Sequence, residues 1–519
     1  MSEQHPSLPL FQQRQEQTLD AAREEAVEKR RAKGYRTARE NVAALCDEGT
    51  FLEYGQMAVA AQRQRRELDD LRSNTAADGV ITGIGQVNAD LLGDEAACGA
   101  AIVVNDYSVL AGTQGFFHHK KLDRIFQVAA EQSLPVVMYA EGGGGRPGDV
   151  DVKTSIAGLN IDTFARWAQL SGQVPRIAVA NGYCFAGNAA LFGCADITIA
   201  TESSWIGMAG PAMVEGGGLG SFKPTDIGPS AEQYKNGVID LLAKDEAHAA
   251  ELARQLLAYF QGPTTDWVAA DQDPLRSSLP LDRRFSYKVR DIITVLFDQG
   301  SFLELRQPYG GAVITGFARL EGKPVGVLAS DCRVMGGAID SPAAEKTARF
   351  MQLCDAFGLS VVSLGDTPGF MVGPDHEQQA AVRRLSRLFV SAASLRVPIV
   401  GVFLRKGYGL GAMALMGGSF STPVYCASWP TGEFGGMGLE GAVKLGFRKE
   451  LEAAESDEAR EALFEQLVGM AYEQGRATEA ASFLELDAVI DPADTRAMII
   501  GALAAAKVPT GFRGMVDTY

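Results

Sequence analysis

Short apolar runs alternate with longer amphipathic stretches along the chain, and the alternation is the same in its two halves. In the first half, the pattern predicts strands and helices in the order 79–87, 98–110, 118–132 (helix), 134–140, 154–172 (helix) and 175–181. In the second half, it predicts them in the order 312–330, 341–357 (helix), 359–365, 377–395 (helix) and 398–405. Strands that alternate with helices in this way predict an α/β fold.

The two halves are also related in sequence. Asp47-Glu-Gly-Thr-Phe-Leu-Glu53 returns as Asp298-Gln-Gly-Ser-Phe-Leu-Glu304, and Val80-Ile-Thr-Gly83 returns as Val313-Ile-Thr-Gly316. Farther along, Leu134-Pro-Val-Val137 is matched by Leu359-Ser-Val-Val362. The matches keep their order, and the separation between partners shrinks from one match to the next. Such a series predicts an internal duplication in which the first copy carries extra residues.

The length of the chain agrees with two domains. A chain of 519 residues is too long for one ordinary core and suits two domains of roughly 200 to 250 residues. The pattern breaks near 265–285, at Gly262-Pro263 and Asp273-Pro274. We therefore expect domains at 1–270 and 271–519.

Four glycine-rich turns follow predicted strands, at 141–146, 181–188, 365–373 and 405–412. Close packing of a strand on a helix explains any one of them, but their paired arrangement favours a functional role. A small residue that opens a helix after a strand leaves backbone amides unpaired, and two such amides can form an oxyanion hole. No turn matches the P-loop pattern, and Gly407-Tyr-Gly-Leu-Gly411 lacks the glycine spacing of a dinucleotide site.

Charge and cysteine usage narrow the class of protein. The formal net charge of −16 disfavours general nucleic-acid binding, so a site for an anionic ligand must be a local basic or amide-lined pocket. The seven cysteines are dispersed without a C-x-x-C pair, which is typical of a reduced intracellular protein without a zinc ribbon. Residues 1–31 have no apolar signal-peptide core, and no run is long and apolar enough to cross a membrane. We expect a cytoplasmic protein.

The sequence lacks the usual side chains of acid–base and nucleophilic catalysis. It has five histidines, and neither H-E-x-x-H nor G-x-S-x-G occurs. His118-His119 beside Lys120-Lys121 could line an anionic site, but a surface cluster at a helix start is the favoured interpretation. Chemistry that relies on backbone amides and a reactive cofactor fits this composition, and we expect no metal.

Several motifs resemble the β-subunit family of biotin-dependent acyl-CoA carboxylases, which includes propionyl-CoA and methylcrotonyl-CoA carboxylases. The N-terminal motifs are Lys33-Gly-Tyr-Arg-Thr-Ala-Arg-Glu40, 47–53 and Asp78-Gly-Val-Ile-Thr-Gly83. The C-terminal motifs are Asp366-Thr-Pro-Gly-Phe370, Arg405-Lys-Gly-Tyr-Gly409, Trp429-Pro-Thr-Gly-Glu433 and Gly435-Gly-Met-Gly438. The resemblance covers about 30–510, almost the whole chain.

The resemblance implies a fold and a reaction. It implies two tandem crotonase-like domains and a homo-oligomer, usually a hexamer, in which the N-domain of one copy faces the C-domain of another. It also implies carboxyl transfer from carboxybiotin to the α-carbon, or the vinylogous carbon, of an acyl-CoA. The first domain would bind acyl-CoA and the second the carboxybiotin arm. Because neither an A-M-K-M biotinylation motif nor an ATP-binding domain is visible, we expect a separate biotin carboxylase/biotin carrier subunit.

The resemblance also implies site residues. The oxyanion amides map onto Ala186 and Gly187 in the first domain and onto Leu410 and Gly411 in the second. We assign CoA binding to Gly143, Gly144, Gly145, Arg146 and Lys120, and the biotin side to Gly369, Phe370 and Tyr408. Propionyl-type members carry an acid where this chain has Met413, so Met413 is a candidate for the acyl pocket and makes it more apolar. We therefore expect a larger or branched acyl group.

Other functions stay open at this point. The same fold and motifs would serve the carboxyltransferase subunit of a biotin-dependent acyl-CoA decarboxylase. A biotin-independent hydratase or isomerase would need a base facing the thioester, and the acids near the turns, Glu141, Asp366 and Glu433, are interpreted as structural. A non-catalytic assembly subunit is an alternative of another class.

Overall fold

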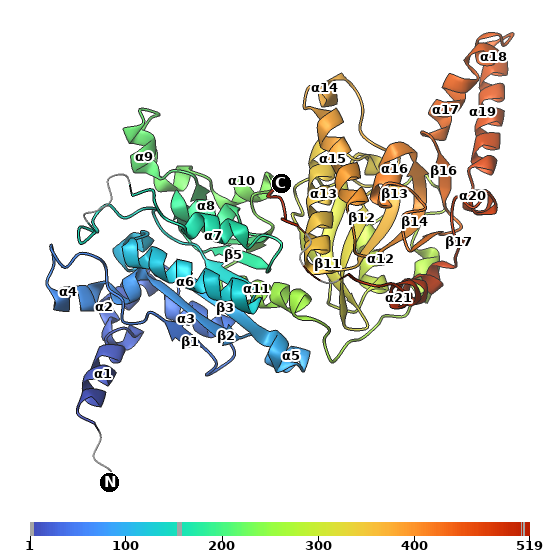
Figure 1. Cartoon of the computed structure of the whole chain (residues 1–519). Coiled ribbons are helices and arrows are strands. Elements are labelled where there is room, and N and C mark those ends of the chain that lie inside the picture. Colours follow the sequence, from blue (N-terminus) through green and yellow to red (C-terminus); the bar gives the residue numbers. More distant parts are fainter. Residues whose placement is uncertain (1–4, 153–157, 510, 512–513) are drawn as a thin grey trace. The chain divides into compact units, whose positions relative to one another are not determined.

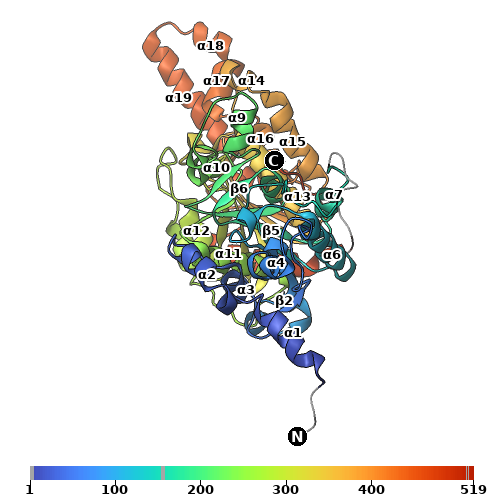
Figure 2. The same cartoon turned by 90° about the vertical axis from the view of Figure 1, so that its left-hand side faces the viewer.

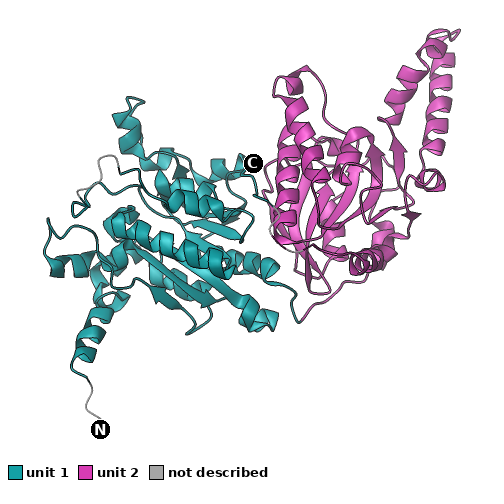
Figure 3. Ribbon diagram, viewed as in Figure 1, with its two compact units in different colours: residues 1–265, 513–518 teal, residues 266–512, 519 magenta. Residues whose placement is uncertain are grey.

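The structure is a computed structural model that describes residues 5–152, 158–509, 511 and 514–519. The chain divides into two compact units, unit 1 (Met1–Thr265 and Arg513–Thr518) and unit 2 (Asp266–Phe512 and Tyr519), coloured separately in Figure 3. Both units have the alternating strands and helices of an α/β fold, as predicted, and Figure 1 labels their elements.

Unit 1 is built on a mixed seven-stranded sheet. Its strands lie in the order β1 (Leu52–Tyr54), β2 (Val80–Gln86), β3 (Gly99–Asn105), β4 (Val136–Tyr139), β5 (Arg176–Ala180), β7 (Ile197–Thr201) and β9 (Leu241–Ala243). The pairs β1–β2 and β2–β3 are antiparallel, and the sheet is parallel from β3 onward. A separate parallel pair joins β6 (Tyr183–Phe185) to β8 (Trp205–Gly207). The carboxyl ends of β4 and β6 carry the glycine-rich turns.

Helices cover this sheet. The principal ones are α1 (Ser7–Glu16), α2 (Glu24–Arg31), α3 (Ala38–Leu45), α4 (Leu68–Asn74), α6 (Phe116–Gln132), α7 (Thr163–Gln169), α8 (Gly187–Gly193), α9 (Pro211–Gly216), α10 (Ser230–Lys235) and α11 (Glu246–Gln261). Leu122, Ile125 and Phe126 of α6 pack on Ala101 and Val103 of β3. Because successive strand residues point to opposite faces, the equally buried Ile102 and Val104 require a second layer, and α3, which contacts β3, contributes to it.

Unit 2 is built on a sheet with a similar strand order. Its sheet runs β10 (Leu303–Leu305), β11 (Val313–Leu320), β12 (Lys323–Ser330), β13 (Val361–Thr367), β14 (Ile399–Tyr408), β15 (Tyr425–Ser428) and β17 (Ala488–Val489), and β16 (Glu433–Gly435) pairs with the end of β14. The sequence repeats at 80–83 and 313–316 fall on β2 and β11, at the same place in the two sheets. The duplication predicted from sequence is thus visible in the topology.

The helices of unit 2 include an extension that unit 1 lacks. Those on the sheet are α12 (Val289–Leu296), α13 (Ser341–Phe357), α14 (Pro374–Glu377), α15 (Ala381–Ala393), α16 (Gly409–Leu415), α20 (Ala477–Ser482) and α21 (Thr495–Ala505). Helices α17 (Leu439–Gly446), α18 (Arg448–Glu452) and α19 (Asp457–Gln474) project from this unit as a hairpin, seen in Figures 1 and 2. No residue of α19 is buried, in keeping with this projection.

Two sequence predictions need correction. The helix predicted over 154–172 is shorter, because α7 begins at Thr163; residues 153–157 lie outside the described part, and Gly158 has a left-handed φ of 66° that ends any continuous helix there. The predicted surface cluster His118-His119 is buried instead. Since α6 already begins at Phe116, these two positions fall on its inward face.

Candidate active site

The first glycine-rich turn of unit 1, Gly142–Gly145, is held between β6 and residues 111–114. The Gly142 amide donates to the Tyr183 carbonyl (2.7 Å), and the Gln114 amide donates to the Gly144 carbonyl (2.7 Å). A Cβ at Gly144 would lie 2.7 Å from the Ala186 Cβ, closer than real Cβ atoms approach. Glycine at this position therefore lets the turn lie directly against the start of α8.

The second turn of unit 1 opens α8. Ala186 has φ 52° and ψ −120°, a conformation that alanine rarely adopts, and its amide already donates to the Gly207 carbonyl at 3.0 Å. In the described part of the chain, the Gly187 amide donates no hydrogen bond. Of the predicted pair Ala186 and Gly187, the structure leaves the Gly187 amide open to an oxyanion.

Unit 2 presents the corresponding pair of turns. A Cβ at Gly411 would lie 2.7 Å from the Gly369 carbonyl carbon and 2.9 Å from the Phe370 nitrogen, so the turn after β13 lies against the start of α16. Among the described residues, the amides of Phe370, Leu410 and Gly411 have no acceptor. The Leu410 side chain is 60% exposed, which places this helix start at the surface of the unit.

The duplication fixes which residues correspond. The bridge Gln114–Gly145 has its counterpart in Ile339–Phe370, and the pair Gly142–Cys184 in Thr367–Gly407. Ala186 follows Cys184 at the same spacing as Gly409 follows Gly407, and both Ala186 and Gly409 have left-handed φ values. Ala186 and Gly187 thus correspond to Gly409 and Leu410, and the two pairs predicted from sequence differ in register by one residue.

A buried acid precedes the turn in each unit. In unit 1 it is Glu141, whose carboxylate accepts two hydrogen bonds from Arg30 of α2, at 2.8 and 2.5 Å. Only 2% of the Glu141 side chain and 9% of the Arg30 side chain are exposed. Burial raises the pKa of Glu141 to about 7, although the Arg30 charge opposes the rise.

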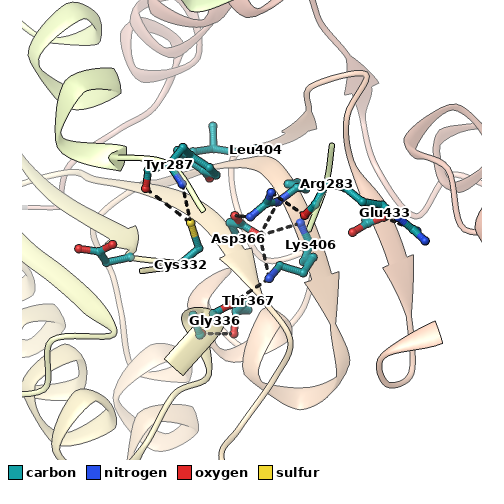
Figure 4. Close-up of polar contacts among 12 residues, drawn as sticks. Arg283, Tyr287, Cys332, Gly336, Asp366, Thr367, Leu404, Lys406 and Glu433 are labelled. Carbon is teal, nitrogen blue, oxygen red and sulfur yellow. Dashed lines mark hydrogen bonds and ion pairs between the residues drawn. The ribbon is translucent and has the colours of Figure 1, made fainter. Parts of the chain in front are cut away.

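In unit 2 the acid is Asp366, shown in Figure 4. Arg405 donates to it at 3.0 Å, and the Lys406 amide donates to it at 3.1 Å. The same guanidinium donates to the carbonyls of Arg283 and Phe285, both at 2.8 Å, so its donors are used inside the unit. Lys406 Nζ donates to the Gly336 carbonyl (3.0 Å), tying β14 to the loop before α13.

The predicted biotin-side residues lie on the two glycine-rich turns of unit 2. Gly369 has a left-handed φ of 113°, and the Phe370 ring packs edge-on against Phe389 with centroids 6.1 Å apart. Tyr408 is buried, and its pKa is raised by burial and by the nearby Glu433 carboxylate. Glu433 in turn faces Arg283 at 3.5 Å. Gly369, Phe370 and Tyr408 are therefore brought together with Leu410 and Gly411.

The charged residues predicted to bind CoA lie differently. The Arg146 side chain is 3% exposed and pairs with Asp78 and, at 3.5 Å, Asp149, so it holds the turn from inside the unit. Lys120 is exposed on α6, with its Nζ 5.6 Å from the Phe116 ring centroid. Gly143 and Gly145 are exposed on the turn, and Gly144 is buried.

Each unit has a cavity near its turns. The unit 2 cavity includes turn residues in its lining, and the unit 1 cavity includes Glu141 and Tyr183, which adjoin the turns. In unit 2, a cavity of about 730 Å³ is lined by Leu410, the half-buried Met413 and the aromatic residues Phe420, Phe434 and Phe483. In unit 1, a cavity of about 590 Å³ reaches Glu141. Its charged and aromatic lining consists of four cations, three carboxylates and three tyrosines: Arg23, Lys29, Arg30, Lys33, Glu24, Glu25, Glu141, Tyr35, Tyr107 and Tyr183. We call the second one the basic pocket.

Sequence reasoning missed the basic pocket. Its signal was the basic run Lys29-Arg-Arg-Ala-Lys33, which begins in α2 and ends two residues after it. Phosphate groups are bound by such cations, and Tyr35 and Tyr107, which lie 4.8 and 5.7 Å from the Arg30 guanidinium, offer faces for stacking.

Comparison with known proteins identifies the family. The family described as "Carboxyl transferase domain" matches residues 29–511. The chain belongs to this family. It is an enzyme, a carboxyltransferase of the acyl-CoA carboxylase family, which confirms the resemblance seen in its motifs.

Individual relatives support this family assignment. The methylmalonyl-CoA carboxyltransferase 12S subunit of Propionibacterium freudenreichii subsp. shermanii is 31% identical over 94% of this chain and 92% of its own. A transcarboxylase 12S crystal structure, described as a hexamer with methylmalonyl-CoA bound, superimposes with a TM-score of 0.83 at 28% identity and covers 99% of both chains. This match confirms the two crotonase-like domains of this carboxyltransferase.

A larger enzyme is also similar. A single-chain, multi-domain long-chain acyl-CoA carboxylase superimposes with a TM-score of 0.91 and 52% identity over 96% of this chain. The carboxyltransferase spans 49% of the length of that protein. Within the described residues, we find no helix long and apolar enough to cross a membrane and no cluster of metal-ligating side chains.

Proposed function

We propose that this carboxyltransferase is the subunit of a biotin-dependent acyl-CoA carboxylase that transfers CO2 to the α-carbon, or the vinylogous carbon, of an acyl-CoA. The observation that carries the proposal is the family match over 29–511 together with a pair of apposed amide turns in each unit. Carboxybiotin, when bound, supplies the CO2 and a ureido nitrogen that accepts the α-proton. The chain itself supplies the binding sites and the hydrogen-bond donors.

Unit 1 is proposed to bind the acyl-CoA. Its basic pocket reaches Glu141, directly before the Gly142–Gly145 turn. Coenzyme A phosphates held by the cations would leave the pantetheine arm to carry the thioester to the amides. As the α-proton leaves, negative charge develops on the thioester oxygen. We propose that it accepts from the Gly187 amide and from the Gly145 amide, which also has no acceptor among the described residues. In this proposal, Gly143 and Gly144 shape the turn, and Arg146 supports it.

Unit 2 is proposed to bind the carboxybiotin group. The amides of Phe370, Leu410 and Gly411 are open, and the neighbouring cavity of about 730 Å³ is lined by apolar side chains on one side, which suits a polar ureido group on an apolar ring system. Hydrogen bonds to the ureido carbonyl would favour negative charge on that group as the CO2 departs. Gly369 and Tyr408 shape this site.

The proposed assembly follows the relatives. The 12S structure is described as a hexamer, and we propose a homo-hexamer for this chain, working with a separate biotin carboxylase/biotin carrier subunit. The segment around α9 exposes a run of large apolar side chains that would suit burial against another copy: Met208, Met213, Leu219 and Phe222, with exposed fractions of 72, 65, 75 and 48%.

The deciding experiment has two parts. We expect the tagged chain, purified gently from its host, to bring down a biotinylated protein in near-stoichiometric amount by mass spectrometry. The purified complex should then fix CO2 onto an acyl-CoA in an ATP-dependent assay. Absence of a biotinylated partner together with absence of biotin-dependent turnover would overturn the proposal, whereas release of CO2 from a carboxyacyl-CoA without ATP would favour a decarboxylase.

We further propose an acyl group larger than acetyl. Met413 lines the unit 2 cavity, which in the proposed hexamer would face the acyl-CoA site in unit 1 of another copy. The 52%-identical protein is described as a long-chain acyl-CoA carboxylase. Turnover should therefore rise from acetyl-CoA through propionyl-CoA to longer acyl-CoAs. Activity on acetyl-CoA equal to or above that on the longer substrates would contradict this.

A further inference from the structure

The Arg30–Glu141 pair is the point where the basic pocket meets the amide turn. Both side chains line the pocket, and Glu141 immediately precedes Gly142 in the chain. Arg30 reaches Glu141 from α2, and its Nε also donates to the Arg36 carbonyl at 2.9 Å. The guanidinium is thus fixed at two points, and its bidentate contact with Glu141 ties the start of the turn to α2.

Glu141 has little freedom to move independently of the turn. Its backbone carbonyl accepts a hydrogen bond from the Asn105 side chain at 3.2 Å. A Cβ at Gly112 would lie 2.4 Å from that carbonyl oxygen, and a Cβ at Gly182 would lie 2.3 Å from Glu141 Oε1. Packing this close on both sides means that a shift of the carboxylate is passed to the main chain of Gly142.

The charges around Glu141 make Arg30 its essential partner. Glu246 at the start of α11 and Asp106 after β3 both act to raise the pKa of Glu141, whereas Arg30 acts to lower it. Tyr35 and Tyr107 face the same pair. A buried carboxylate that loses its cation leaves an uncompensated charge, so the contact with Arg30 determines whether this segment keeps its conformation.

We propose that Arg30 and Glu141 are positioning residues that hold the Gly142–Gly145 turn in its donating conformation and couple it to an anionic ligand in the basic pocket. The proposal rests on the assignment of acyl-CoA to unit 1. An anion that binds the pocket cations meets the same guanidinium that orients Glu141, so occupancy of the pocket and order of the turn change together. Neither residue need touch the reacting atoms.

The test uses the full chain with coenzyme A as the probe. Hydrogen–deuterium exchange of peptides that cover the Gly142–Gly145 turn is measured with and without coenzyme A for the wild type, Glu141→Gln and Arg30→Lys. Lysine keeps the charge of Arg30 but cannot donate two parallel hydrogen bonds, so it is the milder variant if Glu141→Gln folds poorly. Asp196→Asn is the control, because it breaks the buried pair with Arg176 (2.7 Å) at the opposite, amino end of β5.

We expect coenzyme A to slow exchange of the turn in the wild type and in Asp196→Asn, but not in the two pair variants. With an acyl-CoA that the wild type turns over, kcat of Glu141→Gln should fall by about 10- to 100-fold, the cost of a misplaced catalytic group, while KM changes by less than about 3-fold. The wild-type kcat should decline as the pH falls through about 7, and this decline should be absent in Glu141→Gln.

Two outcomes would overturn the inference. One is a folded Glu141→Gln whose turn exchanges, and whose kcat varies with pH, like the wild type. The other is a wild-type turn whose exchange is indifferent to coenzyme A that is shown by calorimetry to bind. Failure of the proposed function looks different, because the wild type would then turn over no acyl-CoA although the exchange experiment would still report on the pair.

Discussion

The two units place a buried acid at the same position and satisfy it differently. Glu141 lies two residues after the end of β4, and Asp366 is the next-to-last residue of β13. These two strands occupy the same place in their sheets. In unit 2 the partner, Arg405, comes from the adjacent strand β14, and its remaining donors are taken by backbone carbonyls. In unit 1 the position equivalent to Arg405 is Gly182, and the guanidinium comes instead from Arg30 on α2.

This difference leaves the two acids in different surroundings. Moving the arginine from the strand to a helix keeps the acid paired but leaves a cavity of about 590 Å³ beside it in unit 1. In unit 2 the guanidinium and the segment 283–287 occupy the space around the acid. The amide turns are common to both units. We therefore expect the residues around the turns to determine which ligand each unit binds.

The largest effect is expected from a substitution that disrupts the paired amide turns, which both units share. Gly411→Ala would place a Cβ 2.7 Å from the Gly369 carbonyl carbon, so the two turns of unit 2 must separate. We expect carboxyl transfer to fall by about 100-fold or more, because a misplacement of about 1 Å has that cost. Gly446→Ala is the matched control, since its Cβ would meet nothing within 4 Å. Similar activities for the two variants would show that the unit 2 turn is not a catalytic element.

A second prediction compares how much the two buried acids, Asp366 and Glu141, contribute to the free energy of unfolding. Asp366→Asn leaves Arg405, whose side chain is 5% exposed, without its counter-ion, and should lower the free energy of unfolding by about 3–5 kcal/mol. Glu141→Gln should cost less than half as much, because Arg30 borders the open basic pocket and stacks near two tyrosines. Calorimetry that resolves the transitions of the two units measures both. Equal losses of unfolding free energy would show that the cavity beside Glu141 does not lessen the cost of removing the acid.

A third prediction concerns pH. The folded protein binds the Glu141 proton up to about pH 7, whereas an unfolded chain releases it near its ordinary pKa of about 4.3. The stability contributed by this group is therefore full below about pH 4 and is lost as the pH rises through 7. Relative to Glu141→Gln, the wild type should lose about 2 kcal/mol of unfolding free energy between pH 5 and 8. Parallel stability curves for the two proteins would contradict the raised pKa.

The smallest expected effect separates two candidate CoA contacts. Lys33→Ala removes an exposed cation of the basic pocket and should weaken coenzyme A binding by about 3- to 10-fold at low salt and less at high salt. Lys120→Ala, on the exposed side of α6, should change it by less than about 2-fold. Titration calorimetry at two salt concentrations compares them. A larger loss for Lys120 would move the CoA site away from the basic pocket.

Periodicity predicted most of the fold because strands and helices alternate with little interruption. The helix predicted over 341–357 matches α13, and the strands predicted near 134–140 and 359–365 match β4 and β13. The pattern failed at 154–172, where polar and glycine residues interrupt the helix. It also failed at His118, because burial of a polar side chain depends on where the helix begins.

The site was harder to predict for a physical reason. Backbone amides act through position and not through side-chain identity, so the sequence shows where small residues permit a turn but not which amides are already paired. The bond from Ala186 to Gly207 illustrates this, because it joins the start of α8 to the end of β8. The basic pocket likewise depends on α2 meeting Glu141, which is far from Arg30 in the chain.

The end of the chain returns to unit 1. The Val516 amide donates to Ser171 Oγ at 2.9 Å, and a Cβ at Gly172 would lie 1.8 Å from the Gly514 carbonyl oxygen. The segment 514–518 therefore packs on unit 1, although residues 266–512 of unit 2 precede it in the chain. During synthesis, when domains otherwise fold in order of emergence, unit 1 cannot gain these last contacts until all of unit 2 and the segment 514–518 have left the ribosome. A product terminated before that segment would lack these contacts, so Ser171 and Gly172 would be uncovered in it.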